Sequence, residues 1–473
     1  DLHTGEHTQL TDGPCEHGQP AWVQGLRTYA FAPDGRSIYF IRNETGFHSV
    51  WQCRLDERDG RVLPHNVRVD GFDEYAVLGQ IAVTAADGDK VAIAAIASAP
   101  DIPPRIVVGY VNGEPNVPAT GGSKQATADA TKKLRVMRRS QYEQFEPGVL
   151  SVPRAVQWYA PDGTAVHGLY YPPANPRFTA TGAPPAIINI HGGPTTQALP
   201  EFNPKAQWYT SRGYAFLDVN YRGSTGYGRA YRQQLQGRWG IVDVEDAISG
   251  ADFLVREGLA DRKRLVILGG SAGGYTVLRA LITKPGFFRA GICLYAVADL
   301  FGMATDTHRF EARYTDSLVG PLPEAAELYR ELSPVFHAVR IQDPVAVFQG
   351  ADDPVVPKRQ ADAIVAALRA ARVPHEYHVY EGEGHGWGRA ETVEKFYAAV
   401  DAFLRKYVVF ACARRAATAP SATRSSATTG SPRACRPPRR HGRPTASSNG
   451  SRWSRSPPWT WSRSTSSPCA SPS

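Results

Sequence analysis

The strongest chemical signal in the sequence is Ser271, which lies in the segment Gly269-Gly-Ser-Ala-Gly273. This segment matches the pattern G-x-S-x-G; the apolar run Leu265–Leu268 precedes it and a helix-like stretch follows at once. A sharp turn from strand to helix exposes a serine hydroxyl, and small neighbours relieve the crowding of its strained backbone. The N–H of Ala272, at the start of the helix, would face a developing oxyanion. The pattern therefore predicts a nucleophilic serine rather than a plain glycine-rich turn.

A nucleophilic serine needs a base, and an acid that orients the base. Both residue types follow Ser271 at the ends of later apolar runs, in the order acid and then base. His385 lies between two glycines in a loop, and we assign it as the base. Asp353 follows the run Val345–Phe348, and we assign it as the acid. Its neighbour Asp352 competes for this role, and the sequence alone leaves that alternative open.

A third motif, His191-Gly-Gly-Pro194, follows the apolar run Ala186–Ile190. Two adjacent glycines let the backbone approach a substrate closely. A free N–H in this loop would complement the N–H of Ala272 in stabilising an oxyanion. The three motifs together indicate acyl transfer by a serine nucleophile.

The elements that must position these residues lie between about residues 141 and 407. Apolar strands alternate there with amphipathic helices, a pattern that predicts a mostly parallel sheet with helices on both faces, which is the α/β-hydrolase fold. The expected strands are 186–190, 215–220, 265–268, 292–295, 345–348 and 376–380. The expected helices are 244–256, 274–283, 359–370 and 392–406.

Residues 1–140 have a different pattern of short strand-like runs separated by turns. In Phe31–Ile41, for example, a Pro-Asp-Gly turn precedes an alternating strand. Short strands at this spacing suggest propeller blades or a sandwich. At roughly 40 to 50 residues per propeller blade, the region can hold only about three blades.

Residues 408–473 consist mainly of Ser, Arg, Pro, Ala and Thr and show no periodicity. We expect this segment to be disordered, and we interpret it as the product of a shifted reading frame rather than as a basic nucleic-acid-binding arm. It holds eleven arginines and no lysine, aspartate or glutamate, so subtracting eleven from the net charge of +8 leaves residues 1–407 at −3. The body of the chain therefore has no net positive charge with which to bind nucleic acid.

The remaining composition excludes further classes of protein. No apolar run approaches the roughly 18 to 20 residues of a membrane-spanning helix. Cys15, Cys53 and Cys293 show neither metal-ligand spacing nor a disulfide framework, so we expect no metal, no cofactor and a cytoplasmic location. The sequence leaves open whether the chain forms a homo-oligomer.

The motifs together resemble the prolyl oligopeptidase family, and most closely its acylaminoacyl-peptidase and dipeptidyl-aminopeptidase branch. The resemblance covers about residues 20–407. Its specific motifs all lie in the second half of that range. It rests on His191-Gly-Gly-Pro194, Asp218-Val-Asn-Tyr-Arg-Gly-Ser-Thr-Gly-Tyr-Gly228, Gly269-Gly-Ser-Ala-Gly-Gly274, Asp353-Pro354 and Gly384-His385.

The resemblance implies a C-terminal α/β-hydrolase domain capped by an N-terminal β-propeller that restricts substrates to short peptides. A complete propeller is far longer than residues 1–140, so we expect a partial propeller that is truncated at its N-terminus. It also implies an oxyanion hole formed by the N–H groups of Gly193 and Ala272. Some relatives place a tyrosine hydroxyl where His191 stands, so here the backbone would have to serve. Many relatives carry an arginine two residues after the catalytic aspartate, where this chain has Val355. This chain must therefore anchor a peptide substrate differently from these relatives.

We therefore expect a metal-free serine peptidase that hydrolyses short peptides or N-blocked amino acids through an acyl-enzyme intermediate. Ser271, Asp353 and His385 would form its catalytic triad. One alternative is a carboxylesterase with the same triad, which Val355 favours. Another is a non-catalytic propeller fragment that binds peptides.

Overall fold

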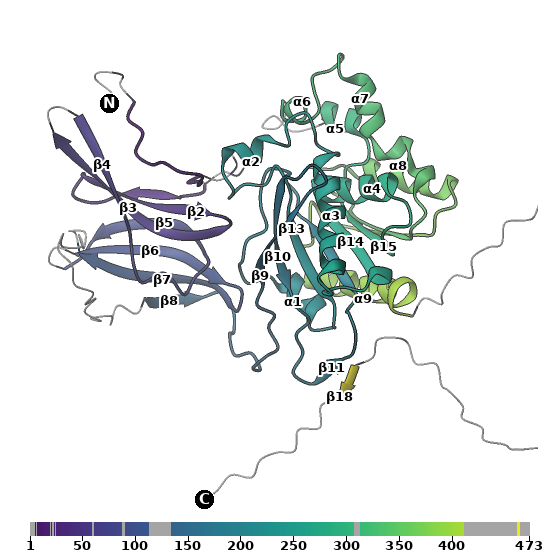
Figure 1. The fold of residues 1–473 in the computed structure, drawn as a ribbon, viewed down its shortest axis with the longest axis horizontal. Coiled ribbons are helices and arrows are strands. Elements are labelled where there is room, and N and C mark those ends of the chain that lie inside the picture. Colours follow the sequence, from purple (N-terminus) through teal and green to yellow (C-terminus); the bar gives the residue numbers. More distant parts are fainter. Residues whose placement is uncertain are drawn as a thin grey trace, which may run out of the picture.

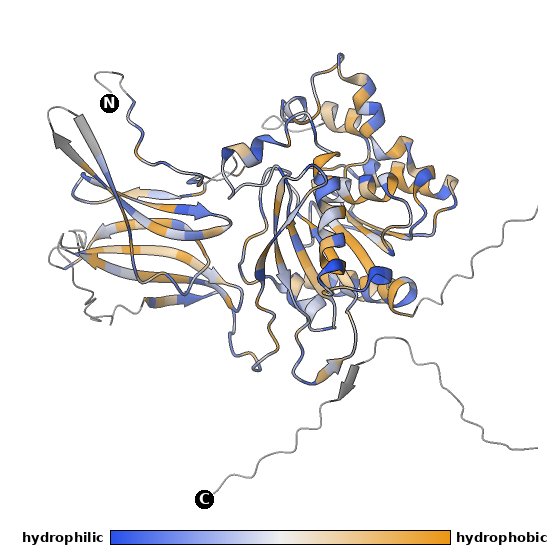
Figure 2. Ribbon diagram, viewed as in Figure 1, coloured by the Kyte–Doolittle hydropathy of each residue, from blue (hydrophilic) through white to orange (hydrophobic). Residues whose placement is uncertain are grey.

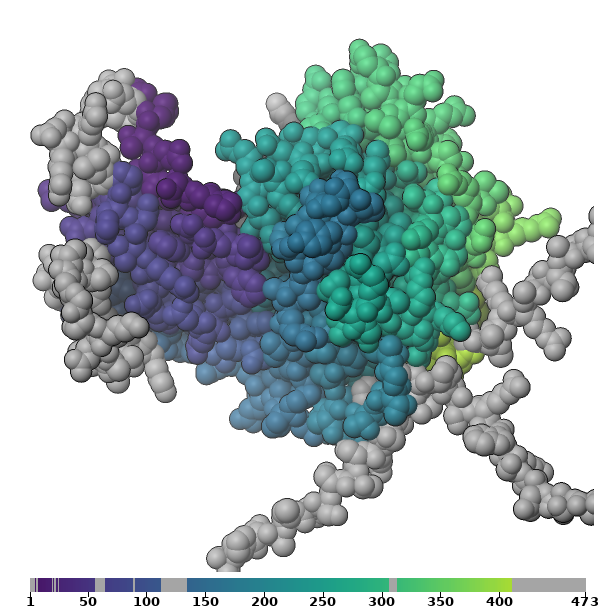
Figure 3. Space-filling view, viewed as in Figure 1, coloured from purple at the N-terminus to yellow at the C-terminus, as the bar shows by residue number. Residues whose placement is uncertain are grey.

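A computed structural model describes residues 5, 7–18, 20, 23, 25–58, 61–87, 90–112, 134–306, 313–410 and 461–463 of the 473. The strands β1 to β8 lie together on one side of the molecule, and the following elements form a mixed α/β unit on the other (Figure 1). The two parts are in contact in the space-filling view (Figure 3). Contacts between them include a hydrogen bond from the Gly226 N–H to Glu16 Oε2 at 2.8 Å and one from the Phe202 N–H to Ser98 Oγ at 3.2 Å.

The N-terminal part contains two four-stranded antiparallel sheets, in the orders β1-β2-β3-β4 and β5-β6-β7-β8. The strands are β1 (Tyr29–Phe31), β2 (Ser37–Glu44), β3 (Phe47–Arg58), β4 (Arg61–Arg68), β5 (Val77–Ala85), β6 (Lys90–Ala99), β7 (Ile102–Asn112) and β8 (Arg135–Arg139). The sequence predicted about three blades, whereas the described residues form two sheets. The estimate was too high because the second sheet extends from Val77 to Arg139, well beyond the roughly 40 to 50 residues of an ordinary blade.

A single hydrophobic core joins these two sheets. Tyr39 and Val50 of the first sheet are buried in the same cluster as Ile93 and Val107 of the second. Because each sheet buries one face against the other, the strands alternate between buried and more exposed side chains, as in β2.

The second part is built on an eight-stranded sheet in the order β17-β16-β15-β14-β12-β13-β10-β9. Pairing is parallel from β13 through β17 and antiparallel where β10 joins β13 and β9. The strands are β9 (Arg154–Tyr159), β10 (Ala165–Tyr171), β12 (Ala186–Ile190), β13 (Ala215–Asn220), β14 (Leu265–Gly270), β15 (Ala290–Leu294), β16 (Val345–Gly350) and β17 (His375–Tyr380). The predicted mostly parallel sheet is confirmed.

Helices cover both faces of this sheet, because neighbouring strand residues point to opposite sides. Ile188 belongs to the core under α3 (Val242–Arg256), α4 (Ala272–Thr283) and α8 (Lys358–Ala370). Ile187 belongs to the core under α1 (Pro204–Thr210) and α9 (Ala390–Leu404). Figure 2 shows hydrophobic residues along the central strands between these layers. The shorter helices are α2 (Arg229–Gln233), α5 (Leu300–Asp306), α6 (Tyr314–Leu318) and α7 (Ala326–Leu332).

Most predicted boundaries differ from the observed ones by one or two residues, and two of the differences have a clear structural reason. Tyr295 was expected within a strand, but β15 ends at Leu294 and Tyr295 turns away with a φ of 37°. The last helix was expected to end at Lys406, whereas a π-helical turn continues it to Val409 because Val408 is buried against the core.

Most of the tail predicted to be disordered lies outside the described residues. Three of its residues, Trp461–Arg463, form β18, which pairs with β11 (Phe178–Ala180). Within the described ranges, no helix is both long and apolar enough to cross a bilayer.

Candidate active site

Ser271 occupies the turn between β14 and α4 with φ 57° and ψ −124°, in a region that non-glycine residues rarely adopt. The turn depends on a glycine nearby. A Cβ on Gly273 would lie 2.2 Å from the carbonyl oxygen of Ile190, so only glycine lets α4 start this close to β12. The sequence thus places the serine in a strained turn at the carboxyl end of the central strands, where its hydroxyl faces a cavity.

His385 and Asp353 meet at the carboxyl ends of β16 and β17. The Nδ1 of His385 is 2.8 Å from Oδ2 of Asp353, and the side chain of Asp353 is fully buried. The neighbouring Asp352 is exposed, and its backbone N–H bonds to the carbonyl of Glu383. The structure therefore brings Asp353 to the histidine and leaves Asp352 in the turn.

The carboxylate of Asp353 is held on all sides. Its Oδ1 accepts the backbone N–H groups of Val355 and Val356, each at 2.9 Å. Its Oδ2 accepts from Gln349 Nε2 at 3.3 Å, in addition to His385. Four donors around one carboxylate fix its orientation toward the histidine.

The loop after β12 lies against the serine. A Cβ on Gly192 would be 3.4 Å from the Cβ of Ser271, and Gly193 has a φ of 117° that favours glycine. At the start of α4, the N–H of Ala272 is among the first-turn donors for which a helix offers no partner. The predicted oxyanion donors, Gly193 and Ala272, thus belong to two segments that meet at Ser271.

Side chains hold this loop in place. His191 Nε2 is 2.7 Å from Ser224 Oγ, and its ring stacks on Tyr221 with centroids 4.3 Å apart. The hydroxyl of Tyr221 donates to the carbonyl of Pro194 at 2.8 Å. Burial lowers the pKa of His191 to about 4, so the imidazole is neutral at neutral pH. His191 therefore acts as a support for the loop.

Ser271 and His385 line one cavity of about 560 Å³. Gly192, Gly193, Tyr295 and Val355 also line it near the serine. Its remaining lining residues include a group of polar side chains contributed by β12, β13, α1 and the loop before α1, namely Asn189, Glu201, Asn203, Lys205 and Asp218. A cavity of this size fits a small ligand.

The polar group of the cavity has internal partners. Lys205 Nζ donates to Asn189 Oδ1 at 3.0 Å, and Asn189 in turn donates to Asp218. Asn203 Nδ2 donates to the other oxygen of Asp218 at 3.3 Å. Burial lowers the pKa of Lys205 and raises the pKa of Asp218, while each charge opposes the shift of the other.

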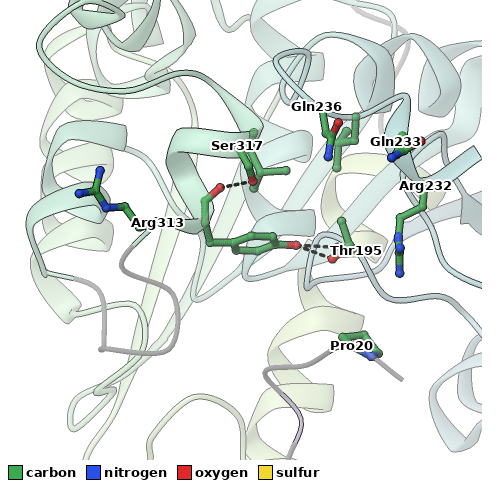
Figure 4. Close-up of a pocket in the computed structure, with 10 residues that line it drawn as sticks. Pro20, Thr195, Arg232, Gln233, Gln236, Arg313 and Ser317 are labelled. Atoms are coloured by element: carbon green, nitrogen blue, oxygen red, sulfur yellow. Dashed lines mark hydrogen bonds between the residues drawn. The ribbon is translucent and has the colours of Figure 1, made fainter. Parts of the chain in front are cut away.

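A second cavity of about 500 Å³ lies beside the same loop (Figure 4). Thr195 is on its wall, and its N–H and hydroxyl contact the hydroxyl of Tyr314 at 3.2 and 2.5 Å. Arg232 and Arg313 stand on opposite sides of Thr195 in this view. Thr195 contributes to this cavity and Thr196 to the catalytic one, so the loop forms a partition between them.

Sequence reasoning missed several residues of the site. Tyr295 packs its ring 4.5 Å from the ring of His385, and no local pattern marks it. Tyr221 and Ser224 lie within the motif Asp218–Gly228, which carried the family resemblance, but their contacts with the loop were not foreseen. Among the described residues, no group of histidine, cysteine and acidic side chains could hold a metal ion.

Comparison with known proteins agrees with this geometry. A family model described as the prolyl oligopeptidase family matches residues 200–409. This region is similar to the prolyl oligopeptidase family. The strand-turn-helix around Ser271 and the loops of Asp353 and His385 all lie within the matched range.

Individual known proteins are similar to this chain over different lengths. A puromycin-hydrolyzing peptidase of Mycobacterium tuberculosis has a similar structure, with 35% identity, a TM-score of 0.72 and coverage of 86% of this chain and 57% of its own. Dipeptidyl aminopeptidase BIII of Pseudoxanthomonas mexicana is 32% identical over 46% of this chain and 33% of its own length. An acylamino-acid-releasing enzyme of Arabidopsis thaliana is 30% identical over 47% of this chain and 30% of its own. The chain thus spans about half or less of these relatives.

Proposed function

We propose that this chain is a serine peptidase that cleaves short peptides or N-blocked amino acids through an acyl-enzyme intermediate. The observation that carries the proposal is the placement of Ser271 in a strained strand-to-helix turn, on the same cavity as a histidine that is hydrogen-bonded to a buried aspartate. Such an arrangement supplies a nucleophile, a base and an orienting acid.

In the proposed acylation step, Ser271 Oγ attacks the scissile carbonyl carbon while His385 Nε2 takes the hydroxyl proton. Asp353 accepts the Nδ1–H of His385, which fixes the tautomer in which Nε2 is free to accept a proton. The carbonyl oxygen becomes an oxyanion that accepts the N–H groups of Gly193 and Ala272, and each such donor is worth ~3 kcal/mol.

The tetrahedral intermediate then collapses. The bond to the leaving amine breaks, and the amine takes the proton from His385 Nε2 as it departs. A water molecule next attacks the acyl-serine, giving its proton to the same nitrogen, and a second collapse releases the carboxylic acid and restores the Ser271 hydroxyl.

The relatives support peptide bonds as the target. Those reported above are named a peptidase, a dipeptidyl aminopeptidase and an acylamino-acid-releasing enzyme. We propose the same class of reaction here, with residues 141–407 as the catalytic domain and the sheets within residues 1–140 as part of a cap that limits substrates to short peptides. The contacts of Glu16 and Ser98 with the catalytic part support this cap.

A carboxylesterase is the second candidate, and one observation favours it. Val355 presents an apolar side chain to the catalytic cavity, where it offers no donor for a peptide carbonyl. A simple ester has no further peptide carbonyl to anchor, so its binding does not depend on such a donor.

The first experiment is labelling of the protein with a fluorophosphonate probe, comparing the wild type with Ser271→Ala. We expect labelling of the wild type only, and no hydrolysis by the variant at unchanged thermal stability. Labelling that persists in the variant would rule out Ser271 as the nucleophile. A labelled wild type is then assayed with a dipeptidyl anilide and with a short-chain nitrophenyl ester, and cleavage of the ester alone would favour the esterase.

A further inference from the structure

Tyr295 lines the catalytic cavity, but the proposed reaction gives it no role. It is the first residue after β15, and its backbone leaves the strand with a φ of 37°, which residues other than glycine rarely adopt. Its N–H donates to the carbonyl of Phe348 at 2.7 Å, while the N–H of Ser271 donates to the carbonyl of Leu294 at 2.9 Å. The backbone of Tyr295 is therefore fixed between β16 and the turn that carries the nucleophile.

The ring of Tyr295 reaches from this backbone to both sides of the catalytic centre. Its centroid is 4.5 Å from the centroid of the His385 ring, and the two planes are inclined at 52°. On the side of the nucleophile, a Cβ on Gly270 would lie 2.8 Å from Cε2 of Tyr295 and 3.1 Å from its hydroxyl oxygen. The ring thus occupies the space that a side chain at position 270 would fill. One side chain contacts both the base and the residue that precedes Ser271.

The hydrogen bond to Asp353 does not by itself fix the plane of the His385 ring. The bond holds Nδ1 at 2.8 Å from the carboxylate, but the ring can still rotate about it. Such a rotation moves Nε2, the atom that takes the proton of Ser271. The backbone on either side adds little stiffness, because Gly384 and Gly386 flank the histidine and glycine adopts a wide range of conformations. A side chain packed against the imidazole is therefore needed to define its plane.

We propose that Tyr295 is a positioning residue, whose ring holds the imidazole of His385 in the plane from which Nε2 accepts the proton of Ser271. This inference rests on the proposed function and adds a residue to its machinery. A general base acts only within hydrogen-bond reach of the proton that it takes. A misplacement of about 1 Å can lower the rate by about 10²-fold, so a contact that sets the plane of the base has a large effect on kcat.

Two competing interpretations are that Tyr295 contacts the substrate and that it only stabilises the fold. Its ring also lies 5.6 Å from the ring of Trp387, which packs on Tyr380 at 4.9 Å, so it belongs to an aromatic cluster. Burial, together with the charge of Asp353, raises the pKa of the Tyr295 hydroxyl, so the side chain is uncharged at neutral pH. Phenylalanine would supply the same neutral ring. A positioning role therefore predicts that Tyr295→Phe keeps kcat, whereas a substrate contact made by the hydroxyl predicts a loss.

The test compares kcat and KM of the wild type, Tyr295→Leu, Tyr295→Phe and the control Tyr380→Leu, on whichever of the anilide and the ester the wild type hydrolyses faster. Tyr380 packs on Trp387, so its loss disturbs the cluster without removing the ring against His385. We expect Tyr295→Leu to lower kcat by about 10- to 100-fold at a KM within about threefold, and to slow fluorophosphonate labelling by a similar factor. Tyr295→Phe and Tyr380→Leu should keep kcat within about threefold of the wild type.

A second pair of variants tests the contact from its other side. Gly270→Ala adds a methyl group 2.8 Å from Cε2 of Tyr295, so the ring must leave the place where it meets His385. We expect a kcat about tenfold lower in the wild-type background. The same substitution in Tyr295→Leu should add less than about a twofold loss, because leucine lacks the atoms that meet the methyl group. An equal loss in both backgrounds would mean that the methyl group acts on the nucleophile or the substrate directly, and would overturn the inference.

Other results would also overturn it. They are a folded Tyr295→Leu that keeps the kcat of the wild type, a loss that appears in KM alone, an equal loss of kcat in Tyr380→Leu, and an equal loss in Tyr295→Phe. Labelling of the wild type separates this inference from the proposed function. A wild type that is not labelled at Ser271 removes the proposed function, whereas a labelled wild type with an unaffected Tyr295→Leu removes only the role of Tyr295. If Tyr295→Leu does not fold, Gly270→Ala decides, because an unchanged kcat would show that His385 does not depend on this ring.

Discussion

Replacing Asp353 by asparagine changes one atom of the site and should inactivate it almost completely. The carboxylate uses one oxygen for the N–H groups of Val355 and Val356 and the other for His385 and Gln349. An asparagine offers one oxygen and one NH₂ group, so it can serve only one of these two pairs of donors.

The two orientations of the amide differ in cost. With its oxygen toward His385, the NH₂ group would face two buried backbone donors, and each donor left unpaired costs ~1–3 kcal/mol. With its oxygen toward the backbone, the NH₂ group faces Nδ1 of His385, and the imidazole can relieve the conflict by moving its proton to Nε2. We expect the second orientation, in which Nε2 can no longer accept the proton of Ser271.

The wrong tautomer should lower kcat by about 10³- to 10⁴-fold, which corresponds to ~4–5.5 kcal/mol of lost transition-state stabilisation. The assay is steady-state hydrolysis of an activated ester together with the rate of fluorophosphonate labelling, with thermal unfolding as a check on the fold. Asp352→Asn serves as the matched control because that side chain is exposed, and it should retain kcat within about threefold of the wild type. A loss below tenfold in Asp353→Asn, in a folded protein, would refute the assigned role of Asp353.

Three further predictions concern the groups around the site. Tyr221→Phe removes the hydroxyl that donates to Pro194 at 2.8 Å and so loosens the loop that carries Gly193. If the Gly193 N–H then loses about half of the ~3 kcal/mol that one oxyanion donor is worth, kcat in steady-state assays should fall about tenfold at similar KM; an unchanged kcat would show that the loop does not need this bond. Arg222→Met leaves Asp246 buried without its partner at 2.8 Å, and urea denaturation should show an unfolding free energy lower by ~3–5 kcal/mol; a change below ~1 kcal/mol would contradict this. Because the pKa of His191 falls to about 4 on folding, the unfolded state binds more protons between that pH and ~6.5, and stability is lost as the pH drops through this window. Between pH 7 and pH 5 the loss from this group should be ~2 kcal/mol and should disappear in His191→Asn; an equal loss in the variant would count against it.

The sequence determined the elements and their order. Apolar runs four to six residues long, separated by amphipathic stretches, are a local signal, and they predicted the central strands and the four longest helices to within a few residues. The turn around Ser271 was equally local, since the glycines around it are the residues that such a backbone requires.

Only the tertiary structure shows which of two neighbouring residues contacts a partner that is distant in the sequence. Asp352 and Asp353 are identical in type and adjacent, and only the approach of the β17 loop to the end of β16 directs one of them to His385. The expected number of N-terminal sheets also differs from the two observed, because a pattern of strands does not show how many residues each sheet contains.

The electrostatic character of the cavity is the feature that the sequence predicted least. Asn189, Glu201, Lys205 and Asp218 come from different elements. Apart from Asp218, which begins the motif Asp218–Gly228, none of them belongs to a motif that the sequence analysis recognised. Their spacing along the chain carries no information about which charges meet, because parallel strand pairing sets Asn189 beside Asp218 across 29 residues of sequence. The sequence by itself determined where a nucleophile could form, and the tertiary structure decided which charges surround the substrate, since Coulombic interactions depend on distance in space and on burial.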